Sequence, residues 1–397
     1  MKRFTIFVAI IVAMFSTGCS SHRKTAKESS VTVKTASTNQ EMPFWCELLY
    51  RTYSNENSNV CLSPLSAQMA IAMTALGAEG DTQQQMYNTI GSDICEKAKD
   101  IIARFNDNTC KSELNLANSI WINDKLSVKE EFINSNKTLF DAEVNTIPFD
   151  KYATEKINGW CSDNTKGKIK DVVDKVGADN MMFLINALYL KTKWWSKFDA
   201  RNTKKQSFTT VAGKVVDVDM MKQSIKTQYY IDDTIQMATL PFEDGFEMLF
   251  VLPRYKKSID DAIMHLATQH KDCTDKMEVY KVEFSVPKFK TEYSVYMREM
   301  LYAMGMEKAF SIDAEFGKIS DQPLYIDNII QKTYINIDEN GAEAAAVTVV
   351  DMRCGAMPPQ EEKHATMTLD RPFIYAIRDK ATDTIVFIGT IGDPNKR

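Results

Sequence analysis

Residues 336–350 read NIDENGAEAAAVTVV, and this stretch decides the fold. Side chains alternate between the two faces of a strand, so every second residue shares a face. From residue 342 onward one face carries only small or apolar side chains, namely Ala342, Ala344, Ala346, Thr348, Val350, Met352 and Cys354. The charges of the segment, beginning with Glu343, all fall on the other face. The segment could therefore enter the middle of a sheet without burying a charge.

The residues that follow predict an exposed loop. Residues 355–363 read GAMPPQEEK, and the adjacent Pro358 and Pro359 withdraw two backbone donors and hold the chain extended. A segment that is patterned as a strand but tethered in a loop indicates a conformational switch. An ordinary hairpin strand followed by a long turn explains the same alternation, so the pattern alone leaves both interpretations open.

Motifs elsewhere in the chain bear on this choice. The segment ENGAEAAA over residues 339–346, which we call the hinge, starts the loop. DRPFIYAIRD (370–379) and FIGTIGDP (387–394) follow it. Upstream, NVCLSPLS (59–66) leads into AMTALGA (72–78). NALYLKTKW (186–194), LPF (240–242) and FVLP (250–253) lie between them. In kind and order these motifs resemble the serpin family of protease inhibitors, and the resemblance covers residues 43–394.

The resemblance implies an α+β serpin fold with three β-sheets, about eight to nine helices and an exposed reactive-centre loop at about residues 341–370. No Gly/Pro/Ser-rich linker interrupts the chain, so residues 41–397 are expected to form one domain. Apolar spacing predicts helices over 43–53, 64–77, 128–139, 152–165 and 294–304, with further helices within 81–106. It predicts strands over 115–122 and 182–191, and mostly strands over 206–290.

The implied function is irreversible inhibition of proteases. In serpins a protease cuts the loop, the cut loop inserts into the central sheet, and the distorted enzyme stays covalently attached. The expected targets are serine proteases of trypsin-like or elastase-like type, and papain-like cysteine proteases as well. The hinge residues carried over from the family are Glu339, Gly341, Ala342, Ala344, Ala345, Ala346 and Thr348. The family usually has a hydroxyl residue where Ala342 stands, and alanine is small enough to serve.

The bond that a protease would cut is not fixed by the sequence. Counting from Glu339 by the usual serpin loop length gives Gly355–Ala356. Side-chain chemistry favours Arg353–Cys354, because arginine fills the acidic pocket of trypsin-like enzymes. Cys354–Gly355 falls between the two. We place Arg353 slightly ahead, and a plain solvated surface charge is the alternative for this residue.

Five further residues match family positions that support the opening of the central sheet. Ser63, Ser66 and Asn186 match positions beneath the sheet whose hydrogen bonds hold its central strands. Gln331 stands where the family often has a histidine, and its amide can still donate and accept. Trp194 matches the aromatic residue where the loop first inserts, although a simple core role is the plainer interpretation.

Two other functions remain open. One is a serpin-fold binding protein whose loop is cut as a substrate without trapping the protease. The other is a Cys/His hydrolase using Cys354 and His364, but no protease signature surrounds them.

His265 and His270 are five residues apart, a poor spacing for one helical face, so we expect no metal site there. We expect no enzyme activity, no cofactor and a monomer. The net charge of −5 without a basic stripe argues against nucleic acid.

The N-terminus has the form of a leader. A basic start and an apolar run over residues 4–15 precede Ser16-Thr17-Gly18-Cys19, which resembles a bacterial lipoprotein signal. Residues 1–18 would be removed, Cys19 lipidated, and residues 19–40 would form a flexible tether. A plain secretory signal is the alternative. We therefore expect an exported protein anchored to the outer membrane, facing either the periplasm or the outside. Export permits disulfides, but the spacing of the seven remaining cysteines does not say which of them pair.

Overall fold

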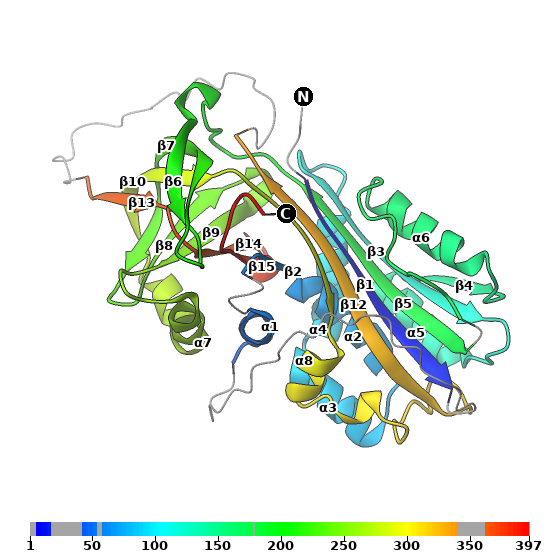
Figure 1. The fold of residues 1–397 in the computed structure, drawn as a ribbon. Coiled ribbons are helices and arrows are strands. Elements are labelled where there is room, and N and C mark those ends of the chain that lie inside the picture. The colour runs from blue at the N-terminus through cyan, green and yellow to red at the C-terminus, as the bar shows by residue number, and fades with distance from the viewer. Residues whose placement is uncertain (1–4, 17–41, 54–57, 178, 340–361, 397) are drawn as a thin grey trace, which may run out of the picture.

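The computed structural model describes residues 5–16, 42–53, 58–177, 179–339 and 362–396. Two sheets meet near the start of the buried helix α2 (Pro64–Ala75), and the other helices lie around them (Figure 1). The helices are α1 Phe44–Thr52, α2 Pro64–Ala75, α3 Gly80–Ile90, α4 Ile94–Phe105, α5 Glu130–Phe140, α6 Ala153–Asn164, α7 Ile259–Asp275 and α8 Arg298–Ala303. The α+β fold class predicted from the sequence is confirmed.

The first sheet has six strands in the order β11-β12-β1-β5-β3-β4. These are β1 Thr5–Ser16, β3 Glu113–Asn123, β4 Glu143–Ile147, β5 Asn180–Lys191, β11 Phe289–Tyr296 and β12 Leu324–Ile337. Every pairing in it is antiparallel except that of β3 with β4.

The second sheet has nine strands in the order β13-β10-β7-β8-β9-β14-β15-β2, with β6 paired to β7. These are β2 Val60–Leu62, β6 Lys204–Thr209, β7 Val215–Ile231, β8 Ile235–Pro241, β9 Phe246–Pro253, β10 Glu278–Pro287, β13 His364–Thr368, β14 Phe373–Asp379 and β15 Thr384–Ile391. The long strand β7 pairs with β10 along most of its length and with β8 at its end. Among the described residues, two of the three sheets expected from the resemblance are therefore joined into one ladder.

Both faces of the six-stranded sheet are covered. Helix α2 is buried along almost its whole length and packs on one face, next to β1 and β5. Helix α6 packs on the opposite face through Ala153, Ile157 and Cys161. Strand β5 is accordingly buried on both sides, whereas the α6-facing side of β12 is only half-buried.

The N-terminal apolar run lies in the centre of this sheet. Strand β1 pairs antiparallel with β12 on one side and with β5 on the other (Figure 1). Its even-numbered residues Ile10, Val12 and Met14 belong to the main core, and Ala13 belongs to the α6 side. The sequence predicted a removable leader over residues 1–18, and residues 5–16 of that segment form strand β1 in the structure.

Three local expectations differ from the structure. The interval 206–290, expected to be mostly strands, contains the long helix α7. Helix α8 is shorter than the predicted helix over 294–304, because β11 continues to Tyr296. The loop predicted to run to residue 370 ends earlier, since His364–Thr368 is strand β13, paired parallel to β10. Among the described residues, no helix is both long and apolar enough to cross a membrane.

Candidate functional site: the central slot and the hinge

The space between β5 and β12, which we call the slot, is the centre of the candidate site. One row across it joins Gln331 of β12, Ile10 of β1 and Asn186 of β5. Gln331, Ile10 and Asn186 are all fully buried. Two buried polar side chains in a core must be hydrogen-bonded, so their partners decide how firmly the slot is held.

The first turn of α2 holds the β12 side of the slot. Ser63 is the N-cap of α2, and its Oγ accepts from the backbone N–H of Ser66 at 3.2 Å. Pro64 follows at the first helical position, where its missing donor costs nothing. The Gln331 amide then pairs with the backbone of Ser63 at both ends. Its Nε2 donates to the Ser63 carbonyl at 3.0 Å, and its Oε1 accepts from the Ser63 N–H at 3.1 Å.

The same turn holds the β5 side. The hydroxyl of Ser66 donates to Oδ1 of Asn186. Asn186 Nδ2 in turn donates to Asn118 Oδ1 of β3 at 2.8 Å, and Asn118 Nδ2 donates to the Phe140 carbonyl at 2.7 Å. One helix start therefore clamps both strands that flank the slot, at the level of Ile10. The network is complete with β1 between the two strands, so a strand can occupy the slot without breaking it.

An aromatic cluster lies where β12 ends. The Trp194 ring stacks on Phe242 with centroids 4.2 Å apart and meets Phe198 edge-on at 5.8 Å. Trp194 is buried, and its Nε1 donates to the Asp338 carbonyl at 3.0 Å. Trp194 is thus a core aromatic, as the plainer interpretation held, and it also fixes the chain immediately before the hinge.

Glu339, the first residue of the hinge and the one hinge residue that the structure describes, is held by two side chains. Its Oε1 accepts from the Thr203 hydroxyl at 2.8 Å, and its Oε2 forms an ion pair with Lys288 Nζ at 2.8 Å. Partial burial acts to raise the pKa of Glu339, but the Lys288 ion pair and the hydrogen bonds outweigh it and leave the pKa below its usual value. The carboxylate therefore stays charged and anchors the start of the loop at neutral pH.

The remaining predicted site residues fall in a part of the chain that the structure does not describe. These are Gly341, Ala342, Ala344, Ala345, Ala346, Thr348, Arg353, Cys354, Gly355 and Ala356, together with Cys19. His364, the proposed partner of Cys354 in a hydrolase, is an exposed residue of β13 whose Nε2 lies 3.6 Å from a carboxylate oxygen of Glu362. The six cysteines described within 42–53, 58–177 and 179–339 are all free thiols.

Comparison with known proteins decides the family. A family model described as "Serpin (serine protease inhibitor)" matches residues 40–394. The chain belongs to the serpin family. This serpin is similar to a serine proteinase inhibitor of Cavia porcellus, with 31% identity over 362 residues that cover 87% of this chain and 86% of the relative.

Solved structures agree. The thermophilic serpin tengpin in its native state superposes with a TM-score of 0.75 at 30% identity, covering 88% of this serpin and 92% of tengpin. Human thyroxine-binding globulin in complex with thyroxine gives a TM-score of 0.76 at 25% identity, covering 89% and 97%. Structural neighbours of this serpin thus include a binding protein in complex with its small-molecule ligand.

Sequence reasoning missed three residues of this site. Asn118 joins the network beneath the sheet, and Lys288 and Thr203 hold Glu339. Asn118 lies on the strand predicted over 115–122, where a polar residue at a buried position was a usable signal. Lys288 and Thr203 are far from Glu339 in sequence. The pairing of β11 with β12 brings Lys288 to Glu339, and this pairing could not be read from the sequence.

Proposed function

We propose that this serpin inhibits serine proteases irreversibly, by inserting its cut loop into the slot between β5 and β12. Cysteine proteases of papain type are a second target class within the same proposal. The observation that carries the proposal is the position of β1, because a peptide strand already fits this slot with hydrogen-bond partners on both sides.

The direction of β1 supports the proposal. Thr5 pairs with Asn336 at the hinge end of β12, and Ser16 pairs with Leu324 at the other end. A loop that leaves β12, turns back and enters the slot must run in the same direction as β1. Its uncharged face, beginning at Ala342, could then occupy the core side where Ile10, Val12 and Met14 now lie.

The energetics favour insertion of any suitable strand. Because β1 is antiparallel to both, β12 and β5 run parallel to each other, and a strand between them gives two ladders where direct pairing would give one. A new strand satisfies both edges and buries apolar side chains at roughly 25 cal/mol per Å². Trapping requires this gain to be withheld until the loop is cut, and we assign that role to the Glu339 anchor, which holds the start of the loop.

The occupied slot also bears on the N-terminus. We propose that residues 1–18 are removed during export, that Cys19 is lipidated, and that residues 19–40 tether the serpin domain to the outer membrane. While β1 stays in the slot, the loop has no place to insert. Removal of the leader would therefore be a condition for inhibition as well as for anchoring.

A binding protein is the second candidate, and the likeness to thyroxine-binding globulin favours it. In that case the loop would be cut without trapping.

A single experiment distinguishes the two functions. Residues 41–397 are mixed with trypsin-like, elastase-like and papain-like proteases, and the products are separated by denaturing electrophoresis. A band that survives denaturation near the summed mass supports inhibition. Cleavage without such a band supports the binding protein. Mass spectrometry of the released C-terminal peptide identifies the cut bond among Arg353–Cys354, Cys354–Gly355 and Gly355–Ala356.

A further inference from the structure

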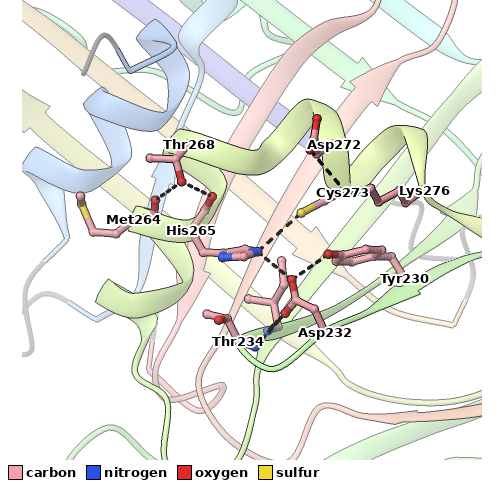
Figure 2. A network of polar contacts seen from close by, with 10 residues as sticks. Tyr230, Asp232, Thr234, Met264, His265, Thr268, Asp272, Cys273 and Lys276 are labelled. Carbon is pink, nitrogen blue, oxygen red and sulfur yellow. Dashed lines mark hydrogen bonds and ion pairs between the residues drawn. The ribbon is translucent and has the colours of Figure 1, made fainter.

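A second polar cluster lies away from the slot, between α7 and the turn that joins β7 to β8. It brings together Asp232 from the turn and His265 and Cys273 from α7 (Figure 2). His265 Nε2 lies 2.8 Å from Asp232 Oδ2 and 3.6 Å from Cys273 Sγ. The three potential ligand atoms all lie within 4.8 Å of one another.

The Asp232 carboxylate is held in a fixed orientation. Its Oδ1 accepts from the backbone N–H groups of Thr234 and Ile235 at 2.7 and 2.8 Å. Its Oδ2 accepts from the Tyr230 hydroxyl at 2.7 Å and faces His265 (Figure 2). A carboxylate oriented by outer hydrogen bonds, with one oxygen directed into a cluster, is the arrangement that protein metal sites use around their ligands.

The geometry fits a small tetrahedral cation with little movement. Zinc bonds of roughly 2.3 Å to sulfur and about 2.0–2.2 Å to nitrogen or oxygen imply tetrahedral edges of roughly 3.6 Å for S···N and roughly 3.4 Å for N···O. The observed S···N distance is 3.6 Å, and the N···O distance is 2.8 Å. The N···O edge must open by roughly half an ångström, and the S···O edge lies within 4.8 Å. His265 is a partly exposed side chain that can move.

A nucleophilic triad does not explain the cluster. In a triad the histidine contacts the nucleophile with one ring nitrogen and the carboxylate with the other. Here Asp232 and Cys273 both meet Nε2 of His265. Cys273 is 1% exposed, and burial raises the pKa of its thiol, so it is neither accessible nor activated.

We propose that Asp232, His265 and Cys273 form a Zn²⁺ site with three protein ligands and an outward position filled by water. The side chains of His265 and Asp232 are 21% and 23% exposed, so solvent can reach the cation from their side. On binding, the Cys273 thiol loses its proton to solvent, and the His265 proton moves to Nδ1 to free Nε2. The bound cation links α7 to the β7–β8 turn and stabilises this end of the nine-stranded sheet. The proposal is independent of protease inhibition.

For the test, full-length wild type and its variants are stripped of metal with a chelator. Co²⁺ and then Zn²⁺ are added back, and the proteins are compared. Wild type should show a sulfur-to-cobalt charge-transfer band and bind one more equivalent of Zn²⁺ than the His265→Gln variant. Its thermal midpoint should rise by roughly 2 °C or more with Zn²⁺ in excess of the dissociation constant. His265→Gln is the primary variant because the side chain is partly exposed, whereas Cys273→Ser changes a buried core residue.

His270→Gln is the matched control. His270 lies on the same helix but stacks edge-on against Trp45, with ring centroids 5.5 Å apart, away from the cluster. It should keep the cobalt band and the midpoint shift, and the variant comparison removes any contribution from other thiols and histidines. Equal Zn²⁺ stoichiometry and equal midpoint shifts in wild type and His265→Gln would overturn the proposal and leave a plain polar contact between turn and helix.

Discussion

Ala342 is the first residue of the uncharged face that starts after Glu339-Asn340-Gly341, and its size and charge should matter only if the loop inserts. Ala342→Arg places an unpaired charge on the face that we assign to the core. Burying such a charge costs about 3 kcal/mol or more, so the rate of trapping should fall at least about a hundredfold while the loop is still cut. Inhibition kinetics and the yield of covalent complex measure this.

Ala345 provides the matched control for that substitution. It lies on the opposite face by strand alternation, together with Glu343, and β12 is only half-buried on that face, so Ala345→Arg should keep most of the trapping rate. If both variants inhibit like the wild type, insertion of this segment is not part of the function. If both lose inhibition equally, the face assignment is wrong.

Glu339 makes the anchor of the hinge depend on pH. Its pKa is lowered in the folded protein, so its contribution to stability is complete above the unfolded value of about 4.3 and disappears as the pH falls through the folded value. Lys288 is partly exposed, which limits the contribution to about 1 kcal/mol or less. We expect Glu339→Gln to lower the thermal midpoint at pH 7. The difference from wild type should shrink below about pH 4. A pH-independent difference would exclude the ion pair as its cause.

Strand β12 depends on Gln331 for its attachment to α2. Gln331→Ala leaves the buried N–H and C=O of Ser63 without their side-chain partner, at a cost of about 1–3 kcal/mol. The thermal midpoint should fall, whereas the rate of loop insertion should change little, because these hydrogen bonds are already made with β1 in the slot. Asn336→Ala, at the half-buried end of the same strand, is the control and should lower the midpoint far less. Faster insertion in Gln331→Ala would mean that this contact also gates the slot.

The helices and strands that the sequence predicted correctly are those with a clear period and a clear end. Helix α2 has Ser63 and Pro64 at its start, and β5 is a continuous apolar run. Helix α7 was missed although its capping box was readable, since Ser258 and Asp261 satisfy each other's backbone N–H groups. The residues of β1 could not be assigned from their pattern, because a short apolar run suits a leader and a central strand equally well.

The contacts that sequence could not predict join elements far apart in the chain. Positions 265 and 273 would lie about 12 Å apart along a straight helix axis, so their spacing does not predict that His265 reaches Cys273. Asp232 enters the cluster only because the β7–β8 turn lies against α7. The same holds at the slot, where the resemblance named Ser63, Ser66 and Asn186 but only the folded chain shows that one helix start binds both flanking strands.

At the scale of the whole molecule, the leader and the loop compete for one slot. Protein refolded with residues 1–40 retained should keep β1 in the sheet, and its trapping rate should be at least tenfold below that of residues 41–397, because insertion must first displace a strand with partners on both sides. Ile10→Asp in the longer form buries a charge between Gln331 and Asn186 and should expel β1, restoring trapping without shortening the chain. Denaturing electrophoresis against one protease compares the three forms. Equal complex yields in all three would mean that β1 does not block the slot in solution. Weak trapping by the longer form together with rescue by Ile10→Asp would establish that removal of the leader converts the protein into an active inhibitor.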